Sequence, residues 1–467
     1  MTIAQELARR IVAFRYGDLP AEAIRWARIG ILDTVAVTLA GANEDCVRIL
    51  ERVEGVGAAP GPALLFGRAR RTHALDAALI NGTASHALDF DDVAKSIGGH
   101  PSVPLVPAII ALGEDTGASG KDALLAYVVG FETESRIARA VNFHHYEKGW
   151  HPTVTIGVFG TVAAAAKLLK LDEEKTAIAL ALACSLAAGI KANFATMTKP
   201  LHVGHCARNG LLAALLAREG FTANPAAFEH SQGYLRVFNG DGNFDAAKIF
   251  RNWADPLEVV DPGLGLKQFP CCASTHPAIE AMLKLRREHK VQPGDVASIE
   301  VLTNPRRLPH TDKPTPKDGL EGKFSIQYAV ARALLDGRIR FEHFTDAAVH
   351  DHRVRALLPL IRAGAHPDMP AESDEQFAAE VIVATRDGRK LARRVPHALC
   401  RGPANPMSRE ELWRKFEDCA ALALPEPRIG PLFETLERLE TLAQLGDLTR
   451  LVELRPGDRA AAGRAAE

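Results

Sequence analysis

The sequence has little of what marks several common protein classes. Of its 467 residues only 6% are aromatic, and 56 lysines and arginines face 57 aspartates and glutamates, for a net charge of -1. A chain with this balance has no general field for nucleic acid or an anionic membrane, so any preference for anions must be local. The first residues, MTIAQELARRIVAF, lack the basic segment and apolar core of a secretory signal. No apolar run reaches about 18 residues without a charge or turn signal, so we expect no membrane span.

Motifs for the common cofactors are also missing. The sequence contains no GxxxxGK[ST] or GxGxxG phosphate loop, no GxSxG elbow and no HExxH helix. Its seven cysteines are an odd number spread over a long chain, which favours a reducing, cytoplasmic setting. Cys271 and Cys272 are adjacent without CxxC spacing, so structural zinc is not expected. We therefore expect a cytoplasmic protein that works without a metal or cofactor.

What the sequence does contain is a series of alanine-rich helical patterns. A chain of this length exceeds one hydrophobic core, so two domains are expected. Helical spacing recurs near residues 3–15, 20–40, 74–90, 103–115, 121–140, 153–169, 173–188, 203–219, 408–421 and 428–444.

The pattern changes after about Gly265. Residues 297–303 alternate like a strand, and 380–395 resemble two strands around an Asp387–Gly388 turn, with a helix between them that ends at Gly337. We predict a mainly α protein, in which a helical domain formed by residues 1–266 and 398–467 carries a smaller α/β domain at 267–397.

Four histidines directly precede proline, namely His100, His151, His276 and His366. Three aspartates, Asp89, Asp91 and Asp92, lie shortly before the first of them. Carboxylates and imidazoles on rigid backbone suit proton transfer, which points to an enzyme. For any single His-Pro pair a role in shaping a turn is favoured by roughly three to one. The aspartates could likewise form a solvated helix end, although negative charge is disfavoured there.

A cationic segment, TMTKPLHVGHCARNG, spans residues 196–210. Lys199 stands there in a short polar interruption between two apolar helices, and could bind a substrate carboxylate as a compact charge. The alternative is a solvent-facing lysine at a helix start, which is favoured by roughly two to one because most lysines are solvated.

A resemblance to a known family favours functional roles for two of these histidines, for one of the aspartates and for Lys199. The chain resembles the MmgE/PrpD family in six segments that follow the family's order: NGTASHALDFDD, GGHPSVPLVPAIIALGE, GWHPTVTIGVFGTVAAAAKLLKL, ANFATMTKPLHVGHCARNG, KQFPCCASTHPAIEA and GLEGKFSIQYAVARALLDG. The similarity extends from about Gln5 to Leu445. It implies a large all-helical domain built from both chain ends, a smaller α/β lid domain and a homodimer. It also implies an active site in the cleft between the domains that uses neither metal nor organic cofactor.

The resemblance places the catalytic positions on Asp89, His100, His151, Lys199 and Lys267. The two lysines would grip substrate carboxylates, with Lys267 arriving when the lid closes. The two histidines would exchange protons, and Asp89 would fix an imidazole tautomer. His276 would start a lid helix, and His366 lies outside every matched motif.

Four further positions would select the substrate: Val93, Met197, Cys272 and His310. Val93 stands where the family's decarboxylase has a threonine, and Cys272 stands where it has a lid histidine. His310 is a loose match for an active-site tyrosine. These departures weaken a decarboxylase assignment and leave the proton-transfer site intact.

The chemistry common to the family is bond breaking at a carbon beside a carboxylate. The resemblance thus implies cofactor-independent proton abstraction from a small di- or tricarboxylic acid, with a hydro-lyase like 2-methylcitrate dehydratase favoured. The alternative is an epimerase of an amino- or imino-dicarboxylate, like iminodisuccinate epimerase. A cis-aconitate decarboxylase-like activity and a non-catalytic polycarboxylate-binding paralogue are less favoured.

Overall fold

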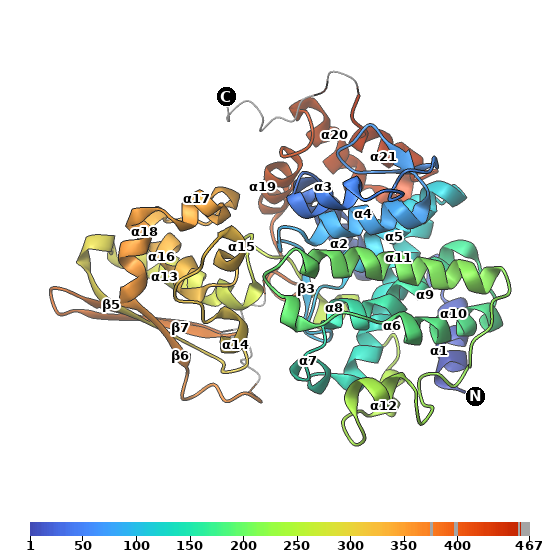
Figure 1. Cartoon of the computed structure of the whole chain (residues 1–467), viewed down its shortest axis with the longest axis horizontal. Coiled ribbons are helices and arrows are strands. Elements are labelled where there is room, and N and C mark those ends of the chain that lie inside the picture. Colours follow the sequence, from blue (N-terminus) through green and yellow to red (C-terminus); the bar gives the residue numbers. More distant parts are fainter. Residues whose placement is uncertain (374–376, 397–399, 456–457, 459–467) are drawn as a thin grey trace. The chain divides into compact units, whose positions relative to one another are not determined.

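In the computed structural model the chain divides into two compact units (Figure 1). The structure describes residues 1–373, 377–396, 400–455 and 458. The first unit comprises Met1–Asn193, Met197–Leu266 and Gly402–Glu467, and the second comprises Phe194–Thr196 and Lys267–Arg401. The domain boundary that we predicted between residues 397 and 398 lies outside the described residues.

Helices build nearly all of the first unit, as the apolar patterns predicted. Their bounds are α1 Ile3–Ala13, α2 Ala21–Gly41, α3 Asp45–Arg52, α4 Ala74–His86, α5 Ser102–Thr116, α6 Gly120–Val141, α7 His144–Glu147, α8 Pro152–Thr155, α9 Gly157–Leu169, α10 Glu173–Leu186, α11 Thr198–Arg218, α12 Tyr234–Asn239, α19 Arg409–Ala420, α20 Glu426–Glu437 and α21 Gly446–Val452. Two short antiparallel ladders join β1 Ala63–Leu64 to β2 Arg71–Thr72, and β3 Val93–Ala94 to β4 Leu264–Gly265.

Helix α9 lies at the centre of this unit. It packs against α5, α6, α10 and α11, which explains why its sequence is apolar on almost every side. The stretch Pro152–Leu169 is long and apolar enough to cross a membrane, but 89% of it is buried inside the protein. We therefore interpret it as a core helix.

Two glycines let α4 and α11 approach closely. A Cβ atom on Gly204 would lie 2.1 Å from the Leu79 carbonyl oxygen, and one on Gly82 would lie 2.8 Å from the Gly204 Cα. Only residues without a side chain fit this crossing. Helix α11 begins at Thr198, earlier than the expected residue 203, so Lys199 lies in its first turn, where Pro200 is tolerated.

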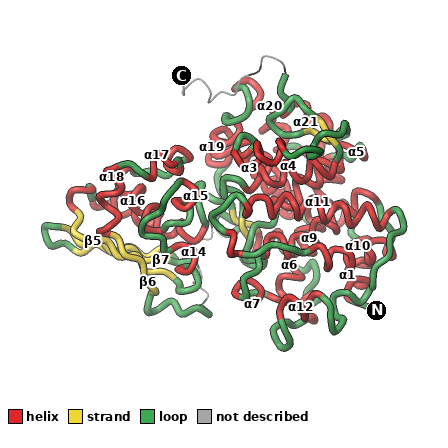
Figure 2. Tube along the Cα trace, viewed as in Figure 1, coloured by secondary structure: helices red, strands yellow, loops and turns green. Residues whose placement is uncertain are grey.

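The second unit is a mixed sheet with helices on one face. The strands β5 Val296–Thr303, β6 Ile361–Ala365, β7 Ala379–Thr385 and β8 Lys390–Val395 lie in the order β6-β5-β7-β8. β5 is parallel to β6, and the other pairs are antiparallel. Helices α13 His276–His289 and α16 Ile326–Asp336 cover one face (Figure 2). The shorter helices are α14 Leu308–Thr311, α15 Gly319–Gly322, α17 Asp346–Val349 and α18 His352–Leu357.

The local predictions for this unit are confirmed. Strand β5 covers the alternating segment, and Gly388 has a φ of 89° in the hairpin between β7 and β8. Helix α16 ends at Gly337, whose φ of 69° suits the left-handed cap. His276 is the first residue of α13, as expected.

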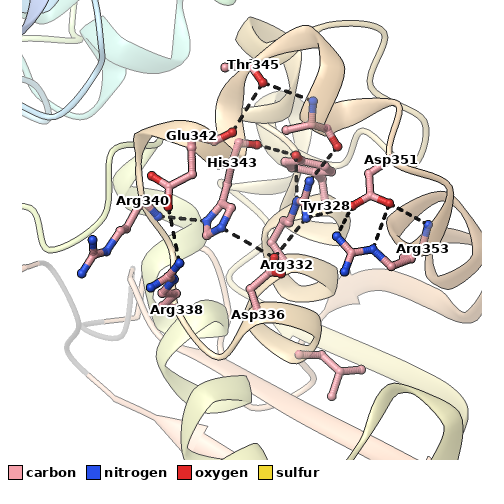
Figure 3. Close-up of polar contacts among 12 residues, drawn as sticks. Tyr328, Arg332, Asp336, Arg338, Arg340, Glu342, His343, Thr345, Asp351 and Arg353 are labelled. Atoms are coloured by element: carbon pink, nitrogen blue, oxygen red, sulfur yellow. Dashed lines mark hydrogen bonds and ion pairs between the residues drawn. The ribbon is translucent and has the colours of Figure 1, made fainter. Parts of the chain in front are cut away.

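A buried polar network holds α16 against its neighbours (Figure 3). The Arg332 guanidinium donates to the Tyr328 hydroxyl at 3.1 Å and to the Ala348 carbonyl at 2.8 Å. It also pairs with Asp336 at 3.0 Å and Asp351 at 3.4 Å. Every contact of this network lies within α16 or joins α16 to the segments beside it. We therefore infer that the network stabilises the packing of α16.

Candidate active site

The three aspartates after α4 are buried. Asp89, Asp91 and Asp92 are 4%, 0% and 0% exposed, so they do not form a solvated helix end. Asp89 has a φ of 54°, a left-handed conformation that aspartate tolerates better than most residues. The chain then runs through β3 to His100, and α5 begins at Ser102.

One Asp91 oxygen contacts two imidazoles. Oδ2 lies 2.8 Å from His86 Nδ1 and 2.8 Å from His100 Nδ1. Burial would raise the pKa of Asp91, but the neighbouring His100 and His86 rings outweigh burial and hold that pKa well below its usual value. Asp91 is therefore an ionised acceptor between two rings. Asp89 Oδ1 lies 3.7 Å from His100 Nε2, so the close carboxylate partner of the imidazoles is Asp91.

These contacts assign the His100 tautomer. Nδ1 of His100 faces the Asp91 carboxylate and also the Asp92 carbonyl oxygen at 2.7 Å. Both neighbours only accept hydrogen bonds, so Nδ1 carries a hydrogen. In the neutral ring the lone pair is then on Nε2, the nitrogen that faces Asp89. His100 is thus oriented to take or give a proton at Nε2.

Lys199 joins this cluster from α11. Its Nζ lies 2.6 Å from Asp89 Oδ1, and the lysine is 5% exposed. The solvent-facing alternative for Lys199 is therefore wrong. The close crossing of α4 and α11 brings the two residues together although they are 110 positions apart.

His151 lies beside the same group and is buried. Its ring stacks at 5.8 Å from His86, and its Nδ1 lies 3.3 Å from His202 Nδ1. Burial, followed by the charge of Lys199, lowers the pKa of His151 well below its usual value. Burial, His205 and Lys199 lower the pKa of His202 to about 4. Two neutral imidazoles therefore face each other here, one as donor and one as acceptor.

Asp92 supports the loop from behind. Its carboxyl accepts hydrogen bonds from the Ser102 hydroxyl and backbone N–H, and the Ser102 hydroxyl lies 2.6 Å from the Tyr127 hydroxyl. Burial and the nearby Asp33 raise the pKa of Asp92 well above its usual value. Asp91 and Asp92 are adjacent, yet their environments favour opposite protonation states.

The remaining predicted residues fall in three places. Val93 is buried in β3, and Met197 is exposed directly before α11. Lys267, Cys272 and His310 belong to the second unit, where Lys267 is buried. In that unit the Ser274 hydroxyl lies 3.1 Å from His310 Nε2, and the Cys272 N–H donates to the Lys323 carbonyl. His366 lies after β6 and contacts Glu380 at 3.1 Å, which agrees with a structural role.

His86, Asp91 and His202 belong to this group in the structure, although the sequence did not predict them as site residues. His86 and Asp91 are five positions apart and both lie in the matched motif SHALDFDD. His202 follows Lys199 by three residues on one helix face, a spacing that could have indicated proximity.

The same side chains include a set that could hold a metal ion. Ligand atoms of His86, Asp89, Asp91 and His100 lie within 4.8 Å of one another. Imidazole and carboxylate are suitable donors for a divalent transition metal. In the observed arrangement, however, Asp89 contacts the Lys199 ammonium and Asp91 contacts two imidazoles. The set as arranged suits proton transfer.

Both parts of the chain are similar to known protein families and enzymes. The MmgE/PrpD N-terminal domain matches residues 5–247, and the MmgE/PrpD C-terminal domain matches residues 269–432. Cis-aconitate decarboxylase of Homo sapiens is 30% identical over 97% of this chain and 95% of its own length. Cis-aconitate decarboxylase of Aspergillus terreus (strain NIH 2624 / FGSC A1156) is 27% identical over 94% and 92%. The mitochondrial 2-methylcitrate dehydratase of Yarrowia lipolytica is 26% identical over 81% and 73%.

Proposed function

This chain belongs to the MmgE/PrpD family, and we propose that it is a lyase that moves a proton at a carbon beside a carboxylate of a small di- or tricarboxylic acid. The observation that supports this most directly is the buried group in which Asp91 contacts His86 and His100, next to the Lys199–Asp89 pair. It combines an oriented imidazole with a cation that suits a carboxylate.

Lys199 binds the substrate in this proposal. A proton beside a carboxylate is weakly acidic, so its removal requires groups that stabilise the negative charge developing on that carboxylate. The buried Lys199 ammonium supplies that charge at a fixed position on α11. Its partner Asp89 holds the ammonium in place before substrate arrives.

His151 and His100 move the proton. His151 is kept neutral by burial and by Lys199, so it is ready to accept a proton near neutral pH. His100 donates from Nε2, and Asp91 stabilises the charged ring at Nδ1. His202 is a positioning residue that sets the orientation of His151.

We favour elimination of water from a β-hydroxy acid, as in 2-methylcitrate dehydratase. The base takes the proton, the electron pair of the C–H bond forms the C=C bond, and the hydroxyl leaves with a proton from the acid. The products are an unsaturated acid and water. The departures Val93, Cys272 and His310 from the decarboxylase pattern favour this reaction.

Decarboxylation is the second candidate. The names of the relatives at 30% and 27% identity support it. In that reaction a C–C bond breaks, CO₂ leaves, and an imidazole delivers a proton to the carbon. The same histidines and lysine serve both reactions, and the substrate decides between them. The roles that the family implies for Lys267, Cys272 and His310 stay predictions, as does the homodimer. The cytoplasmic setting, which the cysteine content favours, also stays a prediction.

The experiment is an NMR screen in deuterated water. The protein is incubated with 2-methylcitrate, citrate, cis-aconitate and aspartate-like acids, and the spectra are followed over time. A new vinyl proton signal from citrate, or conversion of the methyl doublet of 2-methylcitrate into a vinylic methyl singlet, supports the hydro-lyase. Release of CO₂ from cis-aconitate supports the decarboxylase. Exchange with inversion of configuration would indicate an epimerase. Absence of exchange, product and CO₂ with every acid would refute catalysis and favour a binding protein.

Site variants and a surface control test whether His151 and Lys199 take part in catalysis. His151→Gln and Lys199→Ala are expected to abolish turnover while circular dichroism stays unchanged. His352→Gln, whose side chain is 93% exposed, is the control and should keep full activity. Near-normal turnover in either site variant would remove that residue from the mechanism.

A further inference from the structure

A charged cavity lies in the first unit, and none of its lining residues belongs to the buried histidine group. It has a volume of about 530 Å³. Its charged lining residues are Lys95, Arg139, Lys248, Arg251 and Asp261, and we call it the basic pocket. This volume is typical of a small-molecule site.

The chain brings the basic pocket together from four segments. Lys95 directly follows β3, and Asp261 lies shortly before β4, the strand that pairs with β3. Arg139 lies in the last turn of α6, and Lys248 and Arg251 lie between residues 246 and 252. The ladder between β3 and β4 therefore fixes one side of the pocket.

The lining has four cations and one carboxylate. Arg139 pairs with Glu258, and among the described residues the Arg251 guanidinium has a distant ion pair of 3.9 Å with Asp245. The side-chain ammonium groups of Lys95 and Lys248 form no hydrogen bond or ion pair with any described residue. The whole chain has a net charge of -1, so the positive charge of the basic pocket is a local excess.

A neutral lining residue also adds a hydrogen-bond donor. Asn252 contributes an exposed side-chain amide. An amide donor beside lysine and arginine matches an anion with several oxygen atoms.

We propose that the basic pocket binds a compact polyanion, a polycarboxylate or a small phosphate compound, and that this ligand steadies the loop leading to His100. Neither the family match nor the proposed reaction requires a ligand here. Binding is independent of the proposed function, whereas an effect on turnover rests on it.

The contacts of Asn142 connect the pocket to that loop. Its side-chain amide donates to the Ser96 carbonyl at 3.0 Å and to the Ile97 carbonyl at 2.5 Å. The neighbouring Phe143 ring packs against Gly98, and it lies 3.2 Å from the point that a Cβ atom on this glycine would occupy. A ligand held between Lys95 and Lys248 therefore restrains a segment that ends at a proton-carrying histidine.

Calorimetric titration of the full chain tests the binding, with citrate and inorganic pyrophosphate as probes. We expect Lys248→Ala and Lys248→Ala/Arg251→Ala to weaken binding at least tenfold, because these exposed side chains supply charge without supporting the core. Arg48→Ala, an exposed arginine on α3, is the matched control and should bind normally. Tighter binding of one probe identifies the source as carboxylate or phosphate.

Two further experiments distinguish failure of the basic pocket from failure of the proposed function. Lys199→Met, which disables the proposed active site, should still bind pyrophosphate with unchanged affinity. Saturating pyrophosphate should change kcat/KM at least twofold in the wild-type protein and leave it unchanged in the pocket variant. Absence of binding, or equal binding by the wild-type and pocket variants, would overturn the site. Binding without any change in turnover would overturn the link to His100, and a protein with no turnover on any acid would count against the proposed function alone.

Discussion

The Lys199 ammonium lies 2.6 Å from an Asp89 carboxylate oxygen, and both residues are buried. Neither charge is stable alone in such surroundings, because desolvation of an ion is expensive. A substrate carboxylate that approaches Lys199 meets a cation already desolvated and fixed. The pair is thus both a structural element and the proposed carboxylate-binding group.

The first prediction concerns this pair. Lys199→Met should abolish turnover and lower the free energy of unfolding by about 3–5 kcal/mol, because it removes the Lys199 ammonium from the buried Asp89 carboxylate. Lys199→Met/Asp89→Asn should regain most of the stability and none of the activity. Urea denaturation and turnover assays measure the two effects. A double variant no more stable than the single one would show that the residues are not coupled.

The second prediction compares adjacent aspartates. Asp91→Asn should lower kcat by on the order of 10²–10⁴, because an amide cannot stabilise a charged imidazole as the carboxylate does. Asp92→Asn should change kcat by less than about fivefold, because the raised pKa of Asp92 already favours its neutral form. Equal losses in both variants would contradict the roles given to the two carboxyl groups.

The third prediction concerns pH and stability. Burial lowers the pKa of His86 to about 3 from an ordinary value of 6.5, so the unfolded chain binds more protons than the folded one between these values. Stability should therefore be full above pH 6.5 and fall as the pH drops below it, by about 2 kcal/mol at pH 5 from this residue alone. Urea unfolding across this range measures the slope.

Variants identify the source of that slope. His86→Asn should remove the share of the acid loss that comes from His86 and leave the share from the buried His151 and His202, whose pKa values are also lowered. The exposed His352→Gln should leave the loss unchanged. A wild-type stability that stays constant from pH 7 to pH 5 would contradict the neutral His86 on which this prediction rests.

The fourth prediction concerns metal. Treatment with EDTA should leave kcat unchanged, because Lys199 and the imidazoles already match the carboxylates of Asp89 and Asp91. Added Zn²⁺ should inhibit by competing for those carboxylates and imidazole nitrogens. Loss of activity in EDTA that is restored by a divalent ion would instead make the group of His86, Asp89, Asp91 and His100 a working metal site.

The sequence by itself determined what depends on near neighbours along the chain. Apolar spacing located the helices, the Asp387–Gly388 pair located the hairpin, and Gly337 ended α16. The segments around Asp89, His100 and Lys199 indicated the family and the residue types of the site. Each of these features follows from local conformational preference or from a short motif.

Only the tertiary structure decided which of these groups meet. The local segment of Lys199 by itself favoured a solvent-facing side chain. The crossing of α11 with α4 at Gly82 and Gly204 buries Lys199 against Asp89. The same packing made Asp91 the carboxylate between two imidazoles and added His86 and His202 to the group. Burial and the contact between residues 110 positions apart are properties of the packed core, and no local pattern encodes them.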